Sequence, residues 1–284
     1  MIPAAFDYVA PTTVDDAVRA LSEAGEDAKV IAGGQSLLPV LRMRLAAPSK
    51  LIDLGRIPEL RGVREDGDTL VIGAMTTHYE VRRDPLVREH ARLLACATDT
   101  VADPQVRHRG TLGGSLAHAD PAGDLLAPAL ALDAELVVSG MDGRRTVPAA
   151  EFFTDFFETS LRQGEILCEI RLPKRTGWSA HYEKFNRVAQ AWSIVAVAAA
   201  VLVENDTIAQ ARVGLTNMAS TPVRATAVEQ ALIGGPATPE AINEAAQHAA
   251  EGTSPTTDGN ADTEYRQHLA RVLTSRAVTA ALGA

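Results

Sequence analysis

Residues 32–39 read AGGQSLLP, and residues 103–124 read DPQVRHRGTLGGSLAHADPAGD. Both stretches contain adjacent glycines with hydroxyl side chains beside them, at Ser36, Thr111 and Ser115. Because glycine has no Cβ, its backbone N–H groups can approach an anion closely, and consecutive N–H groups form a concave site for phosphate oxygens. Two such loops could hold a diphosphate from both sides without a lysine or an arginine. Either loop by itself is more often a simple turn or a helix cap, so the prediction depends on their combination.

The residues around the first glycine pair alternate between helix and strand patterns. Thr13 can cap a helix whose apolar residues recur at helical spacing. After the glycine pair, Ser36 is predicted to cap a second helix, which would add its positive end to the anion site. Strand, helix and strand in so short a span favour a small parallel sheet. The predicted elements are helices at 14–24 and 37–46 and strands at 29–31 and 50–54.

The rest of the chain predicts further mixed α and β structure. Residues 103–124 are polar and rich in glycine, and a loop of that length inside a compact domain is usually functional. The PKRTG sequence at 173–177 is the best candidate for a linker. We therefore expect an α+β fold in three segments, 1–55, 56–175 and 176–284. The predicted elements are strands at 69–73, 134–140, 165–172, 181–186 and 208–215, an apolar run at 193–203, and helices at 77–83, 86–98, 125–134, 225–232, 239–251 and 264–282.

Composition argues against several classes of protein. A formal net charge of −9 leaves no basic excess for nucleic acid. Cys96 and Cys168 are too few for an iron–sulfur cluster or a zinc site of the CxxC type. We expect two buried thiols, with a single disulfide as the alternative. The longest apolar run, 194–203, is shorter than the about 20 residues that cross a bilayer. The sequence contains no GxGxxG, P-loop, HExxH or GxSxG motif, and its start does not read as a signal peptide.

The two glycine stretches, in this order, resemble those of the FAD-binding subunits of molybdenum hydroxylases, the xanthine dehydrogenase family. The likeness runs from FDYVAPTTVDDAV at residues 6–18 to the C-terminal helices, and is greatest to the medium subunits of aerobic carbon monoxide dehydrogenases. It implies a PCMH-type FAD-binding fold, with a small parallel α/β subdomain and a mainly antiparallel α+β subdomain. A C-terminal domain with a small antiparallel sheet and a helix bundle would follow. The implied cofactor is non-covalent FAD, with no metal in this chain.

The resemblance assigns the FAD diphosphate to the two glycine loops. Asp120 and Asp124 match acidic positions of the second motif, and Asp124 would accept hydrogen bonds from ribityl or ribose hydroxyls. Lys184 matches a lysine near the pyrimidine side of the flavin, where a cation stabilises the anionic reduced ring. As a bare sequence feature, this lysine is more often a solvated residue at a strand edge. The predicted FAD-binding residues are Ile31, Ala32, Gly33, Gly34, Gln35, Ser36, Leu37, Val101, Thr111, Gly113, Gly114, Ser115, Asp120, Asp124, Leu167, Lys184 and Trp192.

Three of these assignments, and several neighbouring residues, need separate comment. Val101 and Leu167 match apolar positions that pack against the flavin ring, although composition alone would place both in the core. Trp192 stands where relatives commonly carry tyrosine near the ring face, and His118 stands where they commonly carry asparagine. The Trp192 difference leaves the electron acceptor open, because this residue could screen the ring. The arginines beside His108 could position phosphates or support the loop.

The resemblance implies an electron-transfer subunit with no catalytic residue of its own. Electrons would come from 2Fe–2S clusters in a small partner subunit, and the molybdenum cofactor would lie in a large one, in a dimer of heterotrimers. The acceptor would be a quinone, a soluble carrier or NAD. The complex would be cytoplasmic, and a membrane-bound acceptor would place it at the inner face of the membrane. Carbon monoxide is the first substrate to consider; aldehydes, xanthine and nicotine-like N-heterocycles follow. A stand-alone flavin oxidase and a non-enzymatic scaffold are the two other hypotheses.

Overall fold

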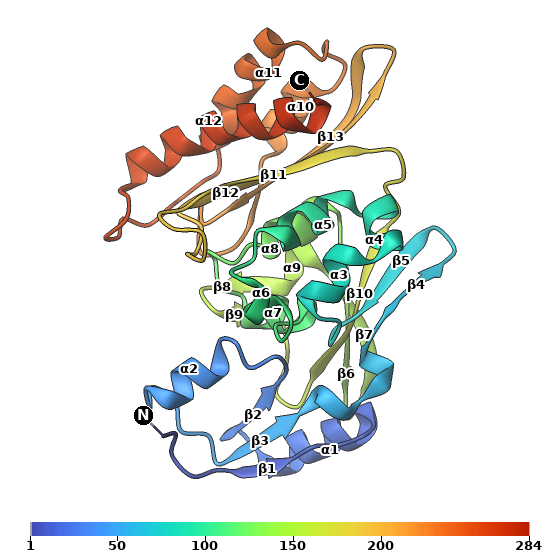
Figure 1. Cartoon of the computed structure of the whole chain (residues 1–284), viewed down its shortest axis with the longest axis vertical. Helices are drawn as coiled ribbons and strands as arrows, with labels where there is room; N and C mark the ends of the chain where they lie inside the picture. Colours follow the sequence, from blue (N-terminus) through green and yellow to red (C-terminus); the bar gives the residue numbers. More distant parts are fainter. Residues whose placement is uncertain (1, 284) are drawn as a thin grey trace.

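The computed structural model describes residues 2–283, so the first residue of the first predicted segment and the last residue of the third lie outside it. The three larger sheets follow one another along the long axis of the molecule, with the N-terminus and the C-terminus at opposite ends (Figure 1), and β8 and β9 form a separate two-stranded sheet. The mixed α+β fold, with a parallel sheet first and antiparallel sheets after it, confirms the predicted fold class. No helix among residues 2–283 is long and apolar enough to cross a membrane.

The first sheet is parallel, in the order β1–β3–β2. The helix α1 covers it with the predicted apolar stripe, and the Thr13 hydroxyl caps that helix by accepting from the Asp16 N–H. The stripe also packs against Ile166 and Cys168, which belong to the second sheet. The strand β1, at the edge of the sheet, was not predicted. The elements are β1 (Asp7–Val9), α1 (Val14–Ala24), β2 (Ala28–Ile31), α2 (Leu37–Arg42) and β3 (Lys50–Asp53).

The predicted capping of α2 by Ser36 is wrong. The Ser36 backbone is already helical (φ −96°, ψ −44°), and its side chain makes no cap hydrogen bond. Instead Gly34, at φ 75°, turns the chain, and its carbonyl accepts from the Leu38 N–H at 2.9 Å. The helix ends at Arg42, shortly before Arg44 adopts φ 57°. Because α2 is so short, its dipole adds little to any anion site, and the individual N–H groups before it matter more.

The second sheet is antiparallel, in the order β4–β5–β10–β6–β7. The helix predicted at 86–98 is two helices, because Ala91 (φ −139°, ψ 48°) breaks it. The elements are the 3-10 turns η1 (Leu54–Arg56) and η2 (Pro58–Leu60), strands β4 (Val63–Asp66), β5 (Thr69–Gly73), β6 (Glu135–Gly140), β7 (Gly143–Pro148), β8 (Phe153–Asp155), β9 (Glu158–Thr159) and β10 (Ile166–Pro173), and helices α3 (His78–Arg83), α4 (Pro85–His90), α5 (Arg92–Asp99), α8 (Leu126–Ala131) and α9 (Ala149–Phe152).

The stretch 103–124, predicted as a long polar loop, contains two short helices, α6 (Pro104–Arg107) and α7 (Leu112–His118). Glycine is a poor helix former, which hid α7 from the sequence pattern. The helix forms because the Thr111 hydroxyl caps it by accepting from the Gly114 N–H at 3.1 Å. The second glycine pair therefore lies in the first turn of a helix.

The third sheet, β11–β12–β13–β14, is antiparallel and packs on both faces. The apolar run predicted at 193–203 forms most of β12 (Val195–Glu204), one of the two inner strands. Val195, Val197 and Val201 of that strand pack with the C-terminal helices, whereas Ala196, Ala198 and Ala200 join the core around α5 and α8. Figure 1 shows these two groups of helices on opposite sides of the sheet. The elements are β11 (Ser179–Phe185), β12 (Val195–Glu204), β13 (Thr207–Thr216), β14 (Val223–Arg224), α10 (Thr226–Leu232), α11 (Pro239–Ala246), η3 (Gln247–Ala250) and α12 (Thr263–Leu282).

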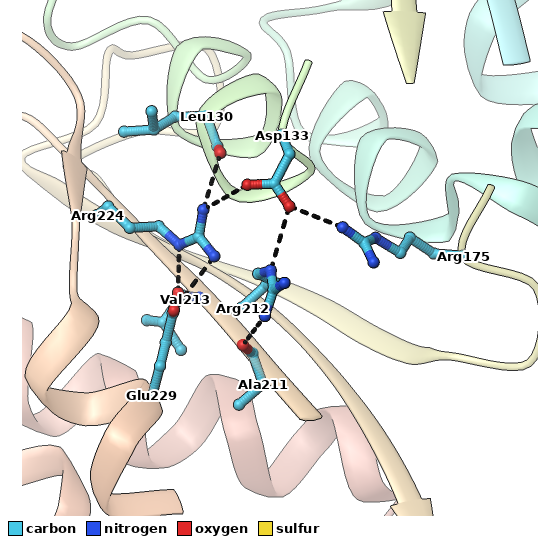
Figure 2. A network of polar contacts seen from close by, with 8 residues as sticks. All are labelled: Leu130, Asp133, Arg175, Ala211, Arg212, Val213, Arg224 and Glu229. Atoms are coloured by element: carbon cyan, nitrogen blue, oxygen red, sulfur yellow. Dashed lines mark hydrogen bonds and ion pairs between the residues drawn. The ribbon is translucent and has the colours of Figure 1, made fainter. Parts of the chain in front are cut away.

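A cluster of arginines around one carboxylate connects the third sheet to the second segment (Figure 2). Asp133, just after α8, accepts from Arg175 at 2.7 Å, Arg212 at 3.2 Å and Arg224 at 2.8 Å. The guanidinium groups of Arg175 and Arg212 also lie over the Trp178 ring, at 4.9 and 5.9 Å from its centroid. Arg175 of the predicted linker thus contacts both Asp133 of the second segment and Trp178 at the start of the third, and these contacts form the junction between the two segments.

Candidate cofactor site

The two glycine loops lie in contact, as the diphosphate hypothesis requires. A Cβ atom placed on Gly33 would lie 2.1 Å from the Arg109 carbonyl oxygen and 2.7 Å from the Gly110 Cα. A Cβ on Gly114 would lie 3.3 Å from the Cβ of Ala32. Only glycine at 33 allows this approach, because any side chain there would separate the loops.

The first loop presents a row of free amides. Within residues 2–283, the backbone N–H groups of residues 33–37 donate no hydrogen bond. Gly33 and Gly34 are buried, whereas Ser36 and Leu37 are partly buried. Unpaired backbone donors are costly unless water or a ligand satisfies them. Five consecutive donors on a glycine turn fit an anionic ligand such as a diphosphate.

The second loop differs from the first, which corrects the expectation of two equivalent amide cradles. Its amides are already used, because Leu112 N–H donates to Thr76 O at 3.0 Å and Gly113 N–H to Ala74 O at 2.9 Å. The next two donate to the hydroxyl and the carbonyl of Thr111. What this loop can still offer a ligand is the half-buried Ser115 hydroxyl and the backbone of Gly113 and Gly114, which have no side chains to block a close approach.

Lys184 and Asp124, both predicted, form a buried pair with 2.7 Å between Nζ and Oδ2. The Asp124 Oδ1 accepts from the Ser193 hydroxyl at 2.8 Å and from the Tyr182 hydroxyl at 3.1 Å. Burial raises the pKa of Asp124, and this outweighs the attraction of Lys184, which lowers it. Because three donors already use the carboxylate, its contact with ribityl or ribose hydroxyls stays a prediction.

The reading of Lys184 as a solvated strand-edge residue is wrong, since its side chain is only 6% exposed. The ammonium group also donates to the Thr100 carbonyl at 3.4 Å, directly before Val101. The Val101 and Ala102 carbonyls accept from the Arg107 guanidinium at 2.7 and 3.2 Å. The arginines beside His108 were predicted either to position phosphates or to support the loop. Arg107 supports the loop, because its guanidinium group binds these two backbone carbonyls.

Two other predicted residues, Asp120 and Trp192, line one pocket of about 270 Å³ between the second segment and the C-terminal one. Trp192 is 58% exposed. The Asp120 carboxylate accepts from the Ala122 N–H at 2.9 Å, and burial raises its pKa while that N–H and His118 lower it. Burial also lowers the pKa of His118, against the pull of Asp120. An aromatic wall beside a half-buried acid suits a flat polar ligand.

Leu167 lies in the main core, 5% exposed, and Val101 packs against the edge of that core. Their contact with a flavin ring stays a prediction.

Sequence reasoning missed Tyr182 and Ser193, which hold Asp124. The strand period of two places Tyr182 on the same face as Lys184, and this signal could have identified it. No group of three or more His, Cys, Asp or Glu side chains among the described residues is placed to hold a metal ion.

Two family models together cover nearly all of the chain. The FAD binding domain in molybdopterin dehydrogenase matches residues 4–175, and the CO dehydrogenase flavoprotein C-terminal domain matches residues 180–281. The carbon monoxide dehydrogenase medium chain of Hydrogenophaga pseudoflava is 43% identical, over 99% of this chain and 98% of that protein. The nicotine 6-hydroxylase medium subunit of Paenarthrobacter nicotinovorans is 37% identical, over 98% of this chain and 97% of that protein.

Solved structures agree with these matches. Carbon monoxide dehydrogenase from Hydrogenophaga pseudoflava superposes with a TM-score of 0.96 at 44% identity, covering 100% of this chain and 99% of that one. Quinoline 2-oxidoreductase from Pseudomonas putida 86 gives a TM-score of 0.94 at 32% identity, with the same coverage. Sequence and structure agree over the full length, and the chain belongs to the family of FAD-binding medium subunits of molybdenum hydroxylases.

Proposed function

We propose that this chain is the electron-transfer subunit of a heterotrimeric molybdenum hydroxylase and holds FAD between its glycine loops. The observation that carries the proposal is the row of free amides at residues 33–37, packed against the segment that leads into α7. Bound FAD supplies electron storage, since a flavin accepts electrons singly or in pairs. The residues of the chain bind and orient it, and none has to act as an acid or a base.

Each part of the site has its own task in this proposal. The amides of residues 33–37 bind the diphosphate, and Ser115 adds a hydroxyl from the other side. Lys184 provides a positive charge near the ring, held in place by Asp124 at 2.7 Å. Trp192 covers part of the ring face beside Asp120. The segments 1–55, 56–175 and 176–284 correspond, in this view, to two FAD-binding subdomains and a C-terminal domain.

Carbon monoxide is the substrate that we propose for the complete complex. Two relatives named carbon monoxide dehydrogenase medium chain are 43% and 37% identical to this chain. The alternative is an N-heterocycle, since subunits of nicotine 6-hydroxylase and caffeine dehydrogenase are each 37% identical. We propose that a large partner holds molybdenum and a small one holds 2Fe–2S clusters, in a cytoplasmic dimer of heterotrimers. A quinone or NAD then accepts the electrons, at the inner face of the membrane in the case of a quinone.

The test is an absorption spectrum of the chain purified alone and with the products of neighbouring genes, followed by heat release of the chromophore. We expect a flavin spectrum with freely released FAD in both preparations, and iron–sulfur absorbance in the complex alone. Gly33→Ala should abolish FAD binding, because the new Cβ meets the Arg109 carbonyl. Gly259→Ala is the matched control, since nothing lies within 4 Å of its Cβ position. A chain that stays colourless after incubation with excess FAD would refute the proposal.

A further inference from the structure

His78 lies next to Gly110, where the two glycine loops meet. Its ring packs against Gly110, where a Cβ would lie 2.7 Å from Cδ2 and 2.9 Å from Nε2 of the imidazole. Gly110 also meets Gly33, with 2.7 Å between its Cα and a Cβ placed on Gly33. The backbone N–H of His78 also donates to the Gly110 carbonyl at 2.9 Å. Gly110 therefore contacts both the imidazole and the first loop.

The surroundings of this ring favour its neutral form. His78 is 4% exposed, and its buried Nδ1 has no hydrogen-bond partner among the described residues. Burial, together with the positive charge of Arg107 on α6, lowers the pKa of His78 to about 4. No carboxylate compensates, because Glu80 of the same helix is bound to Thr77 in a capping box.

The other charged groups near this helix have partners of their own. Asp99 at the end of α5 forms an ion pair with Arg82. The exposed His108 ring stacks on Tyr79, with 3.9 Å between the centroids. The Tyr79 hydroxyl accepts from Arg83 at 2.9 Å. A proton added to His78 would therefore face Arg107 without an acidic partner.

We propose that His78 is a positioning residue for the cofactor site: its neutral ring sets the separation of the two glycine loops, and its protonation separates them and weakens FAD binding. The inference rests on the proposed function of these loops. A charged imidazole in this site has to move toward water. Gly110 then loses its support, and the Arg109 carbonyl moves away from Gly33. The backbone of Gly110 keeps the ring apart from the first loop, so the ring itself does not bind the diphosphate.

The test is the FAD dissociation constant, measured by flavin fluorescence at pH values from 8 down to 4.5. Moving the imidazole toward water removes the effect of burial and raises the pKa of His78 from about 4 toward its ordinary value of 6.5. FAD release is then coupled to uptake of one proton, and affinity falls by up to about tenfold per pH unit below that value. His78→Gln should bind FAD at pH 8 but lose this acid dependence. His78→Ala, which leaves a cavity under Gly110, should bind at least about tenfold more weakly at every pH.

The control is His108→Gln, an exposed histidine in the same region, which should keep the acid dependence of the unmodified chain. Circular dichroism and thermal unfolding of each variant separate misfolding from loss of affinity. An unchanged acid dependence in His78→Gln, or pH-independent binding by the unmodified chain, would overturn the inference alone. Failure of the unmodified chain to bind FAD at pH 8 would overturn the proposed function, and this inference with it.

Discussion

Replacement of Asp124 by asparagine removes one charge of a buried pair and leaves the other. Asp124 is 5% exposed, and the Lys184 side chain 6% exposed. Asparagine keeps an oxygen that can accept from Tyr182 and Ser193, so the main loss is the negative charge beside the ammonium group. Removing one partner of a buried ion pair costs about 3–5 kcal/mol of unfolding free energy, because an uncompensated charge stays buried. We expect Asp124→Asn to fall in this range.

The double variant Asp124→Asn with Lys184→Met distinguishes this cause from general disruption. Both charges are then absent, and an apolar side chain of similar length fills the space. The double variant also removes the uncompensated ammonium charge that Asp124→Asn leaves buried. We therefore expect the double variant to be more stable than Asp124→Asn, with a coupling energy of about 2–3 kcal/mol.

Urea denaturation followed by circular dichroism measures these differences, with Lys184→Met as the fourth corner of the cycle. The slope with denaturant should stay constant if only stability changes. Additive effects of the two substitutions, or a loss below about 1 kcal/mol in Asp124→Asn, would refute the reasoning, since both require that the charges do not interact.

Three further predictions concern the junction and the thiols. Asp133→Asn should lower the unfolding free energy by about 1–2 kcal/mol in urea denaturation, since its side chain is 41% exposed and solvent screens its three arginine contacts; an unchanged midpoint would contradict this. Gly214→Ala should cost more than about 2 kcal/mol, because its Cβ would lie 2.5 Å from the Ala127 carbonyl oxygen; a value equal to that of Gly259→Ala would count against it. Both cysteines are free, but Cys96 is half-buried and not buried as predicted. Burial raises the pKa of Cys168 to about 11, so this thiol should react with Ellman's reagent at pH 8 only after unfolding, and rapid reaction of both thiols in the native chain would contradict this.

The elements with strong periodicity could be predicted from sequence, and those made by local contacts could not. The α1 stripe and the long strands β10 and β13 follow from apolar spacing. The strand β1 has exposed residues and three ladder partners on one side only, so no alternation marks it. The helix α7 depends on one threonine cap that outweighs the poor helix propensity of two glycines.

For the candidate site, the sequence predicted which loops meet but not which groups they offer. The first two amides of the second loop donate to the carbonyls of Thr76 and Ala74, residues that the fold brings beside it. His78 has no pattern that separates it from any histidine at a helix start. Its position under Gly110 follows only from the path of the chain between α6 and α7.

The shared core of the second and third sheets has a consequence for synthesis of the protein. Ala196, Ala198 and Ala200 complete a core whose earlier members begin at Leu70. A ribosome therefore releases the apolar faces of α5 and α8 well before the strand that covers them. The growing chain must protect those faces until β12 emerges, and a fragment that stops at residue 175 would expose them permanently. Chaperone binding should be concentrated in that interval of translation.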